Sequence, residues 1–159
     1  MTKPFGSVIF YVSLLLAYTL FFYPLRGELT HWRPMFVFMT VTFWLLVEPH
    51  VLGVGFAWLA GIALDLLAGS PLGQNALAMA ITAYLLHLVR QRIHNFQIPH
   101  QIFVIAVLGL FYQMVAVVVA LMAGKHADNW QMLYPVVSSS ILWPFIAVVT
   151  WKIYRVESA

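Results

Sequence analysis

The sequence predicts an all-α, polytopic membrane protein with six transmembrane helices, and its composition and hydropathy pattern lead to that prediction. Hydrophobic residues make up 63% of the 159 residues and charged residues only 8%, against roughly 45–50% and about 25% in soluble domains. The mean hydropathy is +0.91. The apolar residues gather into six runs, most of them near the roughly 20 residues that a helix needs to cross a bilayer. With 8 basic and 5 acidic residues, the chain cannot give so large a core a polar surface, so we expect lipid around it.

Turn and interface residues separate the six runs. The first run follows Lys3, and we expect it to stay as an anchor because no small-residue cleavage site follows it. The second begins at Pro34, whose missing N–H is harmless at a first helical position. It reaches the length of a span only if Glu48 and His50 lie at the lipid headgroups. The expected spans of this single integral membrane domain, 1–159, are residues 5–24, 34–48, 51–68, 72–90, 102–123 and 133–154.

The basic residues indicate how the chain is oriented. Six spans place both termini on one side, and the positive-inside rule assigns the more basic side to the cytoplasm. With the termini inside, the inner segments hold Lys3, Arg90, Arg92, Lys152 and Arg155, and the outer loops hold Arg26, Arg33 and Lys125. We therefore expect both termini in the cytoplasm and Arg90 and Arg92 at the cytoplasmic interface.

Asp65 is the one carboxylate inside an apolar run, where an acidic side chain is unfavourable by roughly 2.5–3.5 kcal/mol. Small residues precede it at intervals of four, so all share one helix face on which another helix can come close. Three interpretations stay open: Asp65 accepts N–H groups of the following turn and helix, contacts a partner helix, or handles an ion or proton. The expected helix-packing or partner-binding residues are Gly53, Ala57, Gly61, Asp65, Gly69 and Gly73.

Two further polar residues lie inside apolar runs. Gln113 is in the fifth run and Ser138 in the sixth, and each is a candidate for an interhelical hydrogen bond or for the wall of a pocket. The histidines show no metal-ligand spacing and cysteine is absent, so we expect no metal site and no cofactor. We also expect no catalytic residues, because Ser70 lies in Gly-Ser-Pro-Leu-Gly rather than in a nucleophile elbow. The net charge of +3 is scattered, so no nucleic-acid partner is expected.

One stretch of the sequence, from Val54 to Ala78, resembles the signature of a known family. The pattern Gly-x-x-x-Asp-Leu-x-x-Gly-x-x-Leu-Gly, typical of the rod shape-determining MreD family, matches here at Gly61, Asp65, Leu66, Gly69, Leu72 and Gly73. Arg33-Pro34, Pro49-His50 and Leu142-Trp143-Pro144 are similar to the gammaproteobacterial form of the family. The resemblance extends over essentially the whole chain.

This resemblance implies a non-enzymatic subunit of the bacterial inner membrane. It implies a place in the elongation machinery that builds lateral peptidoglycan in rod-shaped cells, with the transmembrane helix of MreC as a partner. Through the complex, the partners would include cytoplasmic MreB, the glycosyltransferase RodA and its transpeptidase partner. The implied fold is similar to that of the substrate-binding subunits of energy-coupling-factor transporters. Membrane lipids are expected around the protein, and a homo-oligomer stays open.

A protein of another class fits the same pattern. A small-molecule-binding subunit of a membrane transporter would hold its ligand between helices near Asp65, Gln113 and Ser138. It would need a closed polar pocket of a few hundred cubic ångströms, which a helix-binding scaffold does not need.

Overall fold

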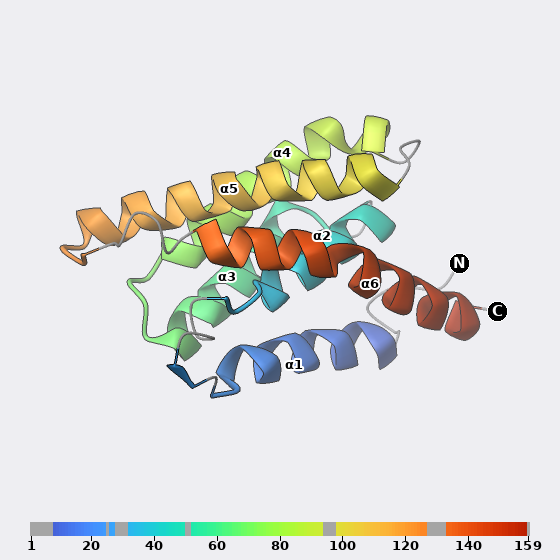
Figure 1. The fold of residues 1–159 in the computed structure, drawn as a ribbon, viewed down its shortest axis with the longest axis horizontal. Coiled ribbons are helices and arrows are strands. Elements are labelled where there is room, and N and C mark those ends of the chain that lie inside the picture. Colours follow the sequence, from blue (N-terminus) through green and yellow to red (C-terminus); the bar gives the residue numbers. More distant parts are fainter. Residues whose placement is uncertain are drawn as a thin grey trace.

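The computed structural model describes residues 8–24, 26–27, 32–49, 52–93, 98–126 and 133–158, and this part of the chain is helical without any strand (Figure 1). Each predicted apolar run overlaps one helix, and α4, α5 and α6 extend beyond the predicted bounds. The helices are α1 (Val8–Phe22), α2 (Phe36–Val47), α3 (Val54–Ala68), α4 (Gln74–Ile93), α5 (Ile98–Met122) and α6 (Leu133–Ser158). The all-α class is therefore confirmed.

The helices run back and forth along one axis, and helices that follow one another in sequence pack side by side (Figure 1). The most extensive contacts join α3 to α4, α4 to α5, α5 to α6 and α1 to α2. As a result, α1, α3 and α5 end at the same end of the bundle at which α2, α4 and α6 begin (Figure 1). We call this the α2/α4/α6 start. The beginning of α1 and the end of α6 lie at the opposite end.

The second helix forms the centre of the bundle. All residues from Val37 to Leu45 are buried, because α2 packs against α1, α3, α4 and α6. A helix that is apolar all round is stable only where apolar surroundings enclose it. Its 12 residues extend only about 18 Å, which is short for a span, but its neighbours rather than lipid surround it.

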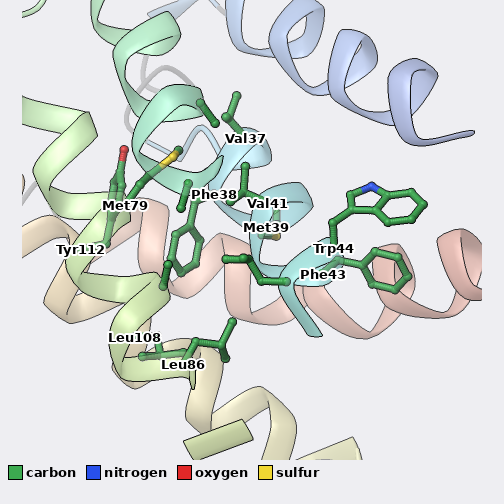
Figure 2. Close-up of a cluster of buried hydrophobic side chains, with 14 of the residues drawn as sticks. Val37, Phe38, Met39, Val41, Phe43, Trp44, Met79, Leu86, Leu108 and Tyr112 are labelled. Atoms are coloured by element: carbon green, nitrogen blue, oxygen red, sulfur yellow. The ribbon is translucent and has the colours of Figure 1, made fainter. Parts of the chain in front are cut away.

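Aromatic side chains fill the space around α2 (Figure 2). Trp44 is completely enclosed, and its ring meets Phe10 of α1 edge-on with 5.2 Å between the centroids. Its indole N–H donates to Ser13 Oγ at 2.8 Å, so this buried polar atom is satisfied. On the other side, Phe38 lies 5.2 Å from the ring of Tyr112 in α5. These contacts tie the central helix to both flanks of the bundle.

The outside of the bundle is apolar. Large exposed side chains include Leu15 in α1, Phe103 in α5 and Phe145 in α6, each about 70% exposed. Exposed apolar area of this extent marks contact with a membrane or with other proteins. Among the described residues, segments 100–122 and 133–152 are long and apolar enough to cross a membrane, with mean hydropathies of 2.7 and 1.6. Helices α1, α2 and α3 are apolar but shorter.

The start of α2 is held by a serine of α6. The N–H of Met35, the residue before α2, donates to Ser139 Oγ at 2.8 Å, and Ser139 is buried. The neighbouring Ser138, which the sequence analysis selected, donates instead to the carbonyl of Pro135 in its own helix. One residue along a helix turns the side chain by about 100°, so only one of the two serines can face α2.

We predict that Ser139→Ala destabilises the protein and that Ser138→Ala does not. The first change leaves a partly buried N–H without its acceptor, which costs up to about 1–3 kcal/mol. The second removes a hydroxyl that bonds within its own turn. Thermal unfolding of both variants in the same detergent measures the difference. Equal unfolding temperatures for the two variants would contradict the assigned role of Ser139.

Candidate functional site

The residues of the predicted small-residue face lie in the hairpin of α3 and α4. Helix α3 ends at Gly69, which adopts the left-handed conformation with φ 63° and donates its N–H to the carbonyl of Asp65. Ser70 N–H reaches the same carbonyl at 3.2 Å. Gly73 also has a positive φ, 98°. Glycine adopts such conformations without the steric cost of a side chain, so Gly69 and Gly73 allow the chain to turn back sharply.

Gly61 lets the two helices of the hairpin touch through their backbones. A Cβ atom on Gly61 would lie 2.4 Å from the Cα of Ala76 and 2.7 Å from the carbonyl oxygen of Asn75. Ala57, one turn earlier, is fully buried. At Gly61, the predicted groove is therefore filled by α4 of the same chain. Gly53 lies at the start of α3, where a Cβ would meet nothing within 4 Å.

Asp65 binds the turn and the first residues of α4 with both of its oxygens. Its side chain is 1% exposed. Oδ1 accepts from Ser70 Oγ at 2.7 Å and from the backbone N–H and side-chain amide of Asn75 at 2.9 and 2.8 Å. Oδ2 accepts from the N–H of Gly73 at 2.9 Å and of Ala76 at 3.2 Å.

These hydrogen bonds satisfy both the carboxylate of Asp65 and the first N–H groups of α4. The first N–H groups of a helix have no acceptor within the helix, and its N-terminus favours negative charge. A carboxylate withdrawn from water needs several donors. Of the three interpretations of Asp65, the structure thus agrees with local capping. The described residues contain no group of His, Cys, Asp or Glu side chains that could hold a metal ion.

The polar cluster extends across to α5. The amide of Asn75 also donates to Ser70 Oγ at 3.2 Å, and the hydroxyl of Tyr112 donates to Asn75 Oδ1. Tyr112 is buried, and Figure 2 shows its hydroxyl directed away from the core cluster. We call Asp65, Ser70, Asn75 and Tyr112 the hairpin cluster. Sequence reasoning missed the last three. In the sequence these three are only polar residues beside the turn and in an apolar helix. That pattern does not show that their side chains meet.

A cavity of about 330 Å³ adjoins the hairpin cluster at the α2/α4/α6 start. Gln113, predicted as a pocket residue, lies in its wall, whereas Ser138 does not. The other polar residues of the wall are Arg33, Ser70, Gln74, Asn75 and Tyr112. The apolar part consists of Phe21, Pro34, Met35, Phe36, Val37, Phe38, Leu64, Ala68 and Pro135.

The two arginines predicted at the cytoplasmic interface belong to the end of α4, at the opposite end of the bundle. Arg90 lies with His87 and Gly53 around a recess of about 30 Å³, and its Nη1 is buried there with no hydrogen-bond partner among the described residues. The side chain of Arg92 lies outside the described residues.

The apolar outer surface, the two segments long enough to cross a bilayer and the internally satisfied hairpin cluster define a helical membrane protein. The sequence model described as rod shape-determining protein MreD matches residues 3–153, and the chain belongs to this family. The resemblance found in the sequence is confirmed. Rod shape-determining protein MreD of Haemophilus influenzae is 23% identical over 123 residues, which cover 77% of this chain and 76% of that protein. No solved structure matches.

We predict opposite effects of alanine at two glycines of α3. Gly61→Ala forces the backbones of α3 and α4 apart, and such overpacking typically costs about 1–3 kcal/mol. Gly55→Ala meets open space and should be neutral or stabilising by up to roughly 1 kcal/mol, because alanine favours the helix. Thermal unfolding in detergent distinguishes the two. If Gly61→Ala unfolds no earlier than Gly55→Ala, the close approach of the helices is wrong.

We also predict that Asp65→Asn is destabilising. Asparagine keeps one acceptor oxygen and turns an NH2 group toward donors, so the bonds to one oxygen are lost. Each bond to a charged group contributes about 1.5–3 kcal/mol. The loss should appear as a lower unfolding temperature. An unchanged unfolding temperature with lost activity in cells would instead indicate that the charge of Asp65 has a role beyond folding.

Proposed function

We propose that this protein is a non-enzymatic scaffold in the bacterial inner membrane that helps the elongation machinery build lateral peptidoglycan and so maintains rod shape. The observation that carries the proposal is the family match over residues 3–153, which extends from before α1 into α6. A role in determining rod shape is the property of that family. The hairpin cluster is consistent with a structural task, because its carboxylate is saturated by hydrogen bonds that hold two helices together.

In this proposal the chain forms one integral membrane domain in which all six helices cross, and both termini lie in the cytoplasm. The alternating directions of the helices (Figure 1) and the excess of basic residues on the side of the termini support this topology. The α2/α4/α6 start then faces the periplasm. The shortness of α2 is compatible with six crossings because other helices enclose it.

We propose that the transmembrane helix of MreC docks on the outer surface of the bundle, and that MreB, RodA and its transpeptidase partner are reached through the complex. Of the predicted small-residue face, Ala57 and Gly61 are buried within the chain. Gly53 and Gly55, two residues later, are exposed with open space around them, so a foreign helix could approach α3 there. A second copy of the chain could use the same surface.

One observation favours a second candidate function. The cavity of about 330 Å³ beside the hairpin cluster falls within the roughly 300–1,000 Å³ of small-molecule sites. Its volume, though not its opening to the outside, would suit a small-molecule-binding subunit of a membrane transporter, the role that a fold like that of energy-coupling-factor subunits would imply.

Depletion of the protein in a rod-shaped host separates the two functions. We predict round cells and, from cells carrying a tagged copy, detergent extracts in which MreC copurifies. Re-expression of wild-type protein restores rods, as should Gly55→Ala, whose side chain is too small to block a docking helix. Depleted cells that stay rod-shaped but fail to take up a nutrient would support the transport subunit and contradict the scaffold.

A further inference from the structure

The cavity at the α2/α4/α6 start has features that a scaffold function does not require. It is partly open to the outside, and its wall combines the polar groups beside the turn of the hairpin with apolar side chains of α1, α2 and α3. Among the described residues of this wall, Arg33 is the one that carries a charge. A ligand bound in the cavity would meet this cation.

Arg33 is held in place by contacts with Phe21 and Tyr23. Its guanidinium lies over the ring of Phe21, 5.3 Å from the centroid, and one Nη donates to the carbonyl of Tyr23. Nε is buried and has no hydrogen-bond partner among the described residues. Among the described residues, the cavity wall contains no carboxylate. A planar guanidinium that is fixed and has a donor left over is suited to a phosphate group.

The start of α2 adds positive potential to the same cavity. Phe36, Val37 and Phe38, the first turn of this 12-residue helix, lie in the wall, and the side chain of the N-cap residue Met35 makes no capping hydrogen bond to them. The partial positive charge of a helix N-terminus favours an anion. The start of α4 differs, because Asp65 already accepts its first N–H groups. The attraction for an anion is therefore concentrated at Arg33 and α2.

The surroundings point to a lipid as the source of that phosphate. The rings of Trp32 and Tyr134 lie 4.8 Å apart near the same end of the bundle, and such amphipathic aromatic side chains are typical of the headgroup level. The apolar part of the wall suits the first methylene groups of an acyl chain. No carboxylate among the described wall residues is placed to receive an ammonium headgroup.

We propose that this cavity binds the headgroup of an anionic glycerophospholipid, with Arg33 and the start of α2 on the phosphate and the apolar wall against the acyl chains. The lipid would enter the cavity from the membrane surface, with the apolar side chains of α1, α2 and α3 around its acyl chains. The proposal depends on the placement of the bundle in a membrane, but not on any protein partner.

Lipid binding to the purified full-length chain in detergent tests this proposal. We expect phosphatidylglycerol to be retained in native mass spectrometry and to raise the unfolding temperature more than phosphatidylethanolamine or inorganic phosphate does. Arg33→Gln should weaken phosphatidylglycerol binding about tenfold or more, because a bond to a charged group is lost. Arg26→Gln is the matched control: it removes the same charge from an exposed residue of the same connection between α1 and α2.

A second variant covers the case in which Arg33→Gln does not fold. Ala68→Leu keeps every charge but places a larger side chain in the wall of the cavity, and it should also weaken binding. Equal retention of phosphatidylglycerol by the wild type and all folded variants would overturn the proposal, as would equal retention of phosphatidylethanolamine. If only inorganic phosphate raised the unfolding temperature, the phosphate site would stand, but a lipid would not be its ligand. If Arg33→Gln lost a protein partner but still retained phosphatidylglycerol, Arg33 would bind an acidic protein segment instead.

Discussion

The requirement that a buried carboxylate find enough donors determines the architecture at one end of this molecule. Asp65 accepts hydrogen bonds from Gly73, Asn75 and Ala76, and these backbone N–H groups exist in that place only because α4 begins there. The helix in turn needs an anion at its start. The positions of the small residues follow from these hydrogen bonds. Gly69 and Gly73 allow the tight turn, and Gly61 lets α4 come close enough to lie within reach of the carboxylate.

Much of the fold could be predicted from the sequence because lipid-facing helices leave long apolar runs, and turn residues separate them. The local part of the site could be predicted too, since Asp65 and the turn that it caps lie within about three helical turns of sequence. The contribution of Tyr112 could not. It joins the hairpin cluster from a distant helix, and nothing in a run of apolar residues specifies which of its polar members faces which neighbour.

The selection of Ser138 over Ser139 and the use of the Gly61 face have a common explanation. Sequence spacing identifies residues that share a helix face but not the identity of what covers that face. Ser139 rather than Ser138 faces α2, and the face of Gly61 meets α4 rather than a foreign helix. The enclosed position of α2 was hidden for the same reason, because a helix that is apolar all round can be surrounded by lipid or by protein.

The two ends of the bundle differ in what they offer to other molecules. At one end the polar groups of the hairpin cluster bond to one another, and Arg33 is the one charged residue among the described residues of the cavity wall. At the other, Arg90 and the exposed Gly53 lie where the topology proposed above places the cytoplasm. Between these ends the described helices expose large apolar side chains such as Leu15 and Phe145, so recognition there depends on shape.

The mutual dependence of Asp65 and α4 also constrains how the newly made chain enters the bilayer. On its own, α3 would carry an unpaired acid into hydrocarbon, at a cost of roughly 2.5–3.5 kcal/mol. Once α4 has been synthesised and has folded back, Asp65 accepts its first N–H groups and so holds α3 and α4 together. The two segments are therefore expected to partition from the translocation machinery together, as one helical hairpin, rather than in succession.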